Sequence, residues 1–126
     1  MTELVGFHHV KLPVSDIERS REWYERVLGL TVDIEFVEDA TVQGLALAGA
    51  GTVSIALRVD PARAAAMSGF DAMALAVPTR AGIVRWQKRL DQLGEPHAGV
   101  VTGHRCGSVL VGLHDPDGLE IRLYAD

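Results

Sequence analysis

Polar residues suited to proton transfer and anion binding recur at alternate positions in three short, strand-like segments of the chain. Alternate residues of a β-strand point to the same side, so each segment would present its polar groups together. A histidine oriented by a carboxylate can transfer protons, and an arginine can hold a carboxylate or phosphate through two parallel hydrogen bonds. The candidates are His9, Lys11, Ser54, Arg58, Glu120, Arg122 and Tyr124.

We predict that His9 acts as a general acid or base and that Glu120 orients it and stabilises its charged form. The remaining five candidates would bind a small anionic molecule. The alternative is structural: Glu120 and Arg122 pair with neighbours across a sheet, and His9 has no chemical role. His8 is expected to point away from His9, because adjacent strand residues face opposite sides.

Length, charge and cysteine content limit the classes of protein to consider. At 126 residues the chain is long enough for one domain, expected over 1–126, and short for two independent ones. No apolar run reaches the roughly 20 residues of a membrane span. The single Cys106 cannot close an intrachain disulfide, so a cytoplasmic location is expected. The net charge of −5 argues against nucleic acid and membrane surfaces as partners, and favours small molecules.

An internal repeat organises the elements that would position these residues. Sliding the sequence by half its length places Trp23 over Trp86, within two helical patterns that each end at a glycine. Each half reads as a strand, a helix and three more strands, which predicts an α+β fold of two βαβββ modules. Module one is expected over about 1–60 and module two over about 70–126, with the intervening segment as a linker. Tight turns are expected at 49–51 and 115–118.

Three segments, 9–20, 23–30 and 115–121, resemble the vicinal oxygen chelate superfamily, the glyoxalase, bleomycin-resistance and extradiol-dioxygenase group. The resemblance extends over nearly the whole chain. It implies a curved mixed sheet around a cavity that takes a small-molecule ligand, and it implies a homodimer.

The resemblance also implies a divalent cation, held by residues from the first and last strands of each half. The matching positions here are His9, Ala56, Ala72 and Arg122, and only the first has a side chain that binds metals. We therefore expect no metal and no other cofactor. The alternative is a weakly bound divalent metal at His9 and Glu120.

Three functions follow from these residues, and the sequence leaves open whether the protein is an enzyme. The leading hypothesis is a metal-independent glyoxalase-like enzyme, of the lyase, isomerase or cyclase type, acting on a small anionic substrate. The first alternative is a protein that sequesters a ligand, as bleomycin-resistance proteins do. The second is a metal-dependent glyoxalase or dioxygenase, which the three non-ligand residues disfavour.

Overall fold

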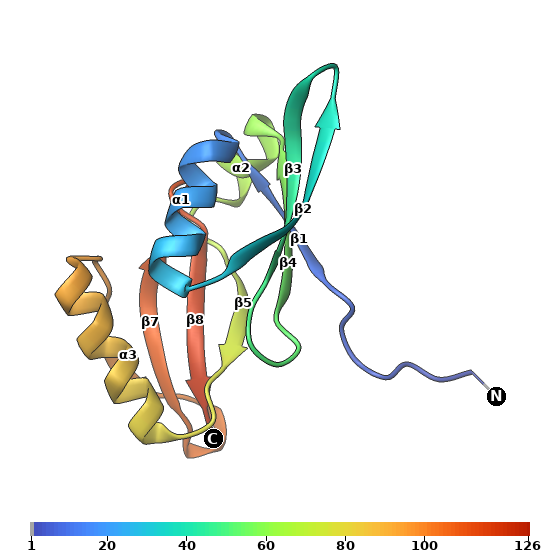
Figure 1. Cartoon of the computed structure of the whole chain (residues 1–126). Coiled ribbons are helices and arrows are strands. Elements are labelled where there is room, and N and C mark those ends of the chain that lie inside the picture. Colours follow the sequence, from blue (N-terminus) through green and yellow to red (C-terminus); the bar gives the residue numbers. More distant parts are fainter. Residues whose placement is uncertain (1) are drawn as a thin grey trace. The chain divides into compact units, whose positions relative to one another are not determined.

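Two four-stranded mixed sheets, each with its own long helix, make up the computed structural model, which describes residues 2–126 (Figure 1). The chain divides into two compact units, one up to Arg63 and one from Ala64 to Asp126. Apart from a short helix at residues 61–67 and a 3₁₀ turn at residues 104–106, each unit has the element order β, α, β, β, β, so the predicted α+β class and the two βαβββ modules are confirmed.

The first unit pairs its strands in the order β1-β4-β3-β2. Strands β1 and β4 run parallel, and the other neighbours are antiparallel. Helix α1 packs on β2, β3 and β4. The elements are β1 (Val10–Val14), α1 (Ile17–Leu28), β2 (Thr31–Glu38), β3 (Thr41–Ala48) and β4 (Ser54–Val59).

The second unit repeats this topology, with the strand order β5-β8-β7-β6. Its first and last strands, β5 and β8, are parallel, and α3 packs on β6, β7 and β8. A short 3₁₀ turn, His104–Cys106, links β6 to β7. The elements are β5 (Asp71–Ala76), α3 (Arg80–Leu93), β6 (Val100–Thr102), β7 (Ser108–His114) and β8 (Glu120–Ala125).

Capping residues set the ends of both long helices. The Asp16 side chain accepts a hydrogen bond from the Arg19 amide, and the Thr79 side chain caps α3 in the same way. Gly29 and Gly94 end the helices in the left-handed conformation, with φ of 71° at each. Both helices therefore end at a glycine, as the sequence predicts.

Strand alternation gives the second sheet one buried face and one open face. In β8, Ile121, Leu123 and Ala125 are buried at 1% exposure or less, on the side that α3 covers. Arg122 and Tyr124 alternate with them and therefore point to the open side. The candidate functional groups of this unit thus lie on the sheet face that α3 leaves uncovered.

The segment expected to be a linker contains a helix. Helix α2 (Pro61–Met67) follows Asp60, whose carboxylate accepts a hydrogen bond from the Arg63 amide at 3.2 Å. Proline preset for the first helical turn and a run of alanines explain why this segment is helical. No helix within residues 2–126 is long and apolar enough to span a bilayer.

Candidate functional site

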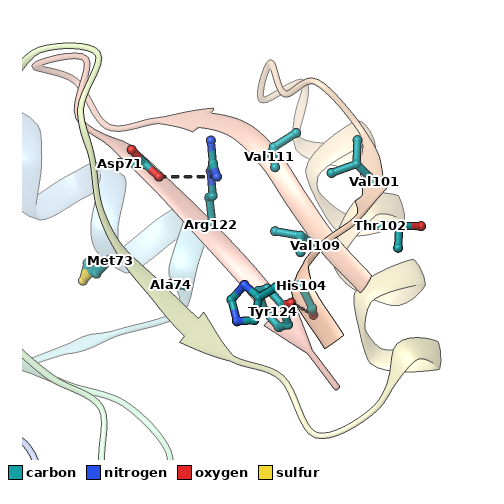
Figure 2. Close-up of a pocket in the computed structure, with 11 residues that line it drawn as sticks. Asp71, Met73, Ala74, Val101, Thr102, His104, Val109, Val111, Arg122 and Tyr124 are labelled. Atoms are coloured by element: carbon teal, nitrogen blue, oxygen red, sulfur yellow. Dashed lines mark hydrogen bonds and ion pairs between the residues drawn. The ribbon is translucent and has the colours of Figure 1, made fainter. Parts of the chain in front are cut away.

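A pocket opens on the uncovered face of the second sheet, with a volume of about 450 Å³ (Figure 2). That volume lies in the range of about 300 to 1,000 Å³ that small-molecule sites occupy. Valine side chains of β6 and β7 form one wall, and β5 contributes the opposite side. The lining residues are Asp71, Met73, Ala74, Val101, Thr102, Gly103, His104, Val109, Val111, Arg122 and Tyr124.

Arg122 and two carboxylates form the charged end of this pocket. The Arg122 Nε donates to Glu120 Oε2 at 2.6 Å, and Arg122 Nη1 lies 3.3 Å from Asp71 Oδ2 (Figure 2 shows the contact with Asp71). The bond to Glu120 raises the pKa of Arg122 above its ordinary value, so the guanidinium stays charged. The carboxylates fix its orientation on the sheet.

Glu120 is held by the backbone as well as by Arg122. The Gly112 amide donates to Glu120 Oε2 at 3.2 Å, where the pairing of β7 with β8 is irregular. The hydrogen bond from Arg122, and then the one from Gly112, hold the pKa of the Glu120 carboxyl below its usual range despite partial burial. A carboxylate held in this way is a weak proton acceptor, and Glu120 does not line the pocket.

Tyr124 and His104 form the other end of the pocket. Their rings lie 4.9 Å apart in a tilted arrangement, and the Tyr124 hydroxyl donates a hydrogen bond to the His104 carbonyl oxygen. The 103–107 segment wraps around the tyrosine: a methyl group at Gly107 would lie 2.4 Å from Tyr124 Cε1, and one at Gly103 would lie 2.7 Å from the hydroxyl oxygen. Only glycine at these positions lets the loop approach the ring so closely.

Three of the predicted site residues lie in the first unit, on the open side of its sheet. Lys11 pairs with Ala56 across β1 and β4, next to Ser54 and Arg58 on the same side of β4, while the intervening residues of β4 are buried. Arg58 Nη2 donates to a carboxylate oxygen of Glu38 at 2.9 Å. This ion pair leaves Lys11 as the uncompensated charge of the group, so the first unit holds a weaker cationic site than the sequence predicted.

His9 lies just before β1, outside the paired strand. Strand alternation therefore does not determine its direction, and the expectation that His8 points away from it is wrong. The two Nδ1 atoms are 2.9 Å apart, and both side chains are exposed. The predicted set thus falls into two groups: Glu120, Arg122 and Tyr124 lie together on β8, and the others belong to the first unit.

The residues at the expected metal positions do not fit a metal site. Alanine stands at two of them, and at the fourth Arg122 is a cation already bonded to Glu120 and Asp71. Across residues 2–126 no cluster of three or more histidine, cysteine, aspartate or glutamate side chains has a geometry that could hold a metal ion. The chemistry of this donor set offers no first coordination shell.

Of the four lining residues with a titratable side chain, two, Asp71 and His104, are not among the predicted site residues. Asp71 was missed because it meets Arg122 only through the parallel pairing of β5 with β8. His104 lies in the 3₁₀ turn, and that turn borders the pocket. The glycines at 103 and 107 were the available signal, since a pair of glycines around a polar stretch indicates close packing of the backbone.

A comparison with protein families matches residues 6–123 to the model described as the Glyoxalase/Bleomycin resistance protein/Dioxygenase superfamily. No curated protein has a significant match to the sequence.

Solved structures of similar fold cover almost the whole chain. The lactoylglutathione lyase of Agrobacterium tumefaciens has a TM-score of 0.80 at 14% identity, covering 98% of this chain and 96% of its own. TnmS3, an antibiotic binding protein from a Streptomyces species, has a TM-score of 0.78 at 20% identity, covering 99% and 98%. A fosfomycin resistance protein of Listeria monocytogenes has a TM-score of 0.73 at 13% identity, covering 98% and 95%. At these identities the likeness concerns the fold.

Proposed function

The chain belongs to the Glyoxalase/Bleomycin resistance protein/Dioxygenase superfamily, and from this premise we propose that it binds a small organic molecule in the pocket of its second unit. The observation that supports the proposal is the division of the pocket into three parts. Arg122 offers hydrogen-bond donors at one end, valines form a wall, and the ring of Tyr124 lies at the other end (Figure 2). Mostly apolar walls with a few fixed polar groups are typical of small-molecule sites.

Reversible binding, rather than catalysis, is the function that this geometry supports best. The leading enzyme hypothesis gives Glu120 a part in proton transfer through His9. However, Glu120 Oε2 already accepts hydrogen bonds from Arg122 and Gly112, and both bonds lower the pKa of its carboxyl. The similar structures include both a lyase and an antibiotic binding protein, so the fold is compatible with either activity. A metal-independent enzyme acting through His9 and Glu120 stays a prediction.

An NMR titration tests the proposed binding. The full chain, labelled with ¹⁵N, would be titrated with a panel of small aromatic molecules that includes neutral and charged members. We expect saturable shifts of the backbone amides at Val109, Val111 and Tyr124, because these residues line the pocket.

Filling the pocket supplies the control. Ala74 lies on the exposed side of β5 and lines the pocket, so Ala74→Trp should abolish the shifts while the fold is kept. Ala66→Trp, at an exposed position of α2, should leave them unchanged. Shifts that survive Ala74→Trp, or that spread evenly over the chain, would contradict binding at this site.

A further inference from the structure

We infer that the pocket of the second unit selects neutral or cationic ligands over anions, because two carboxylates already neutralise the arginine that lines it. This inference rests on the proposed binding function. It also replaces the anionic ligand that the sequence predicts from Lys11, Arg58 and Arg122, because that prediction does not include Asp71, the second carboxylate beside Arg122.

The charge count at this end of the pocket is one guanidinium against two carboxylates, which leaves a net charge of −1. Both carboxylates lie within ion-pair distance, at 2.6 Å for Glu120 and 3.3 Å for Asp71. The Glu120 side chain is 14% exposed, so water screens its charge poorly. The Asp71 side chain is 46% exposed and lines the pocket, where it faces an incoming ligand. An anion would thus meet a carboxylate beside the arginine.

Arg122 keeps hydrogen-bonding capacity that suits a neutral acceptor. A guanidinium carries five N–H groups. Nε donates a hydrogen bond to Glu120, and Nη1 forms the ion pair with Asp71. Nη2 has no hydrogen-bond partner within residues 2–126. A carbonyl or amide oxygen could accept from Nη2 while a nearby N–H or cationic group of the same ligand donates to Asp71.

No second cation compensates the pair of carboxylates from within the pocket. Apart from Arg122, the lining residues with a titratable side chain are Asp71, His104 and Tyr124. Outside the pocket, His114 pairs with Glu120 across β7 and β8. The lining itself therefore places one guanidinium beside the two carboxylates.

Three molecules of nearly equal shape test this selection: benzoate, benzamide and benzamidinium, which carry charges of −1, 0 and +1. Each would be titrated at pH 7.5 and low salt into the ¹⁵N-labelled full chain. We expect benzamide and benzamidinium to shift the amides of Val109, Val111 and Tyr124 with an affinity at least about five-fold above that of benzoate, since a partly exposed charge pair retains several-fold effects on binding at low salt.

Removing one carboxylate should change the order of affinities. In Asp71→Asn the net charge around Arg122 falls to zero, so the affinity for benzoate should rise about five-fold and that for benzamidinium should fall. Asp91→Asn is the matched control: it makes the same change in total charge on α3, and asparagine keeps an oxygen that can accept from His97 Nε2. It should leave the order unchanged.

The outcomes separate this inference from the proposed function. If benzoate binds as tightly as benzamide or tighter, the charge selection is overturned while the pocket remains a binding site. If none of the three molecules shifts the pocket amides, both the selection and the proposed binding are contradicted. If Asp91→Asn changes the order as much as Asp71→Asn does, the effect comes from overall charge, and the selection by Asp71 and Glu120 is overturned.

Discussion

At the scale of single residues, the charged side chains of this protein act mainly through their partners. Arg58 and Arg122, read from the sequence as anion-binding groups, are each bonded to a carboxylate, Glu38 and Glu120 respectively. An exposed ion pair adds little to stability, whereas a shielded carboxylate that accepts two hydrogen bonds has a larger effect. Glu120 is such a shielded carboxylate, so its contribution to the free energy of unfolding should depend measurably on pH.

Because the pKa of Glu120 is lower in the folded protein than in the unfolded chain, its carboxylate stabilises the fold above a pH of about 4.3, and this contribution is lost as the pH falls through the folded pKa. Glu120→Gln should therefore lower the free energy of unfolding by about 1–2 kcal/mol at pH 7, and the difference from wild type should shrink below about pH 4. Urea unfolding at several pH values measures both effects.

Glu22→Gln is the control for this prediction. This change breaks the ion pair between Glu22 and Arg26 on α1, in which the Glu22 side chain is 61% exposed. It should lower the free energy of unfolding by less than about 0.5 kcal/mol at any pH. A loss at Glu120→Gln that stays constant down to pH 3 would show that the carboxylate is not stabilised in its ionised form.

The sequence predicts individual site residues only where local periodicity decides their direction. Arg122 and Tyr124 lie in a regular strand, so alternation places them correctly on the open face. His9 precedes the paired part of β1, where alternation does not apply, and Asp71 reaches Arg122 through a pairing between distant segments. Such partners depend on tertiary register, which a single sequence does not specify.

At the scale of elements, local signals predict most of the fold. The glycine stops of α1 and α3 and the turn at 115–118 follow from residue types, and in that turn the Gly118 amide bonds to the Asp115 carbonyl at 2.9 Å. The sequence predicts a linker where helix α2 lies, because polar and proline residues such as those around 60–63 are typical of loops. The Asp60-Pro61 pair before an alanine run was nevertheless a helix-start signal.

The turn between β6 and β7 depends on backbone contact with Tyr124, and this gives an element-scale prediction. In Gly107→Ala the added methyl would meet Tyr124 Cε1 at 2.4 Å and the Ala125 carbonyl oxygen at 2.9 Å, although φ is an ordinary −71°. We expect a loss of about 2 kcal/mol or more in the free energy of unfolding, together with altered shifts of the Tyr124 ring protons, because the backbone must move away.

Gly51→Ala makes a useful comparison. It has open space around the added methyl but a φ of +67°, so its cost should be about 1 kcal/mol, from strain alone and without any change at Tyr124. Thermal or urea unfolding ranks the two variants. Equal losses, or an unchanged Tyr124 signal in Gly107→Ala, would mean that the loop does not clamp the ring.

At the scale of the whole molecule, sheet edges and exposed apolar side chains bear on the homodimer that we predict. Within residues 2–126, the outer strands of each sheet pair with one neighbour, and such edges invite pairing unless they are covered. The edge strand β2 also exposes Ile34, Phe36 and Val37 at 47%, 46% and 57%. Large side chains that are half exposed on an edge strand are typical of surfaces that a second chain covers.

Sedimentation equilibrium of the full chain at micromolar concentration tests this prediction against the subunit mass of 13.6 kDa. We expect twice that mass, and we expect Phe36→Lys to lower it towards the monomer, because a cation would have to be buried in the interface. Val84→Lys adds the same charge at a side chain that is 62% exposed on α3 and should leave the mass unchanged. If wild type sediments as a monomer, the homodimer is contradicted. If Phe36→Lys remains fully dimeric, then β2 lies outside the interface.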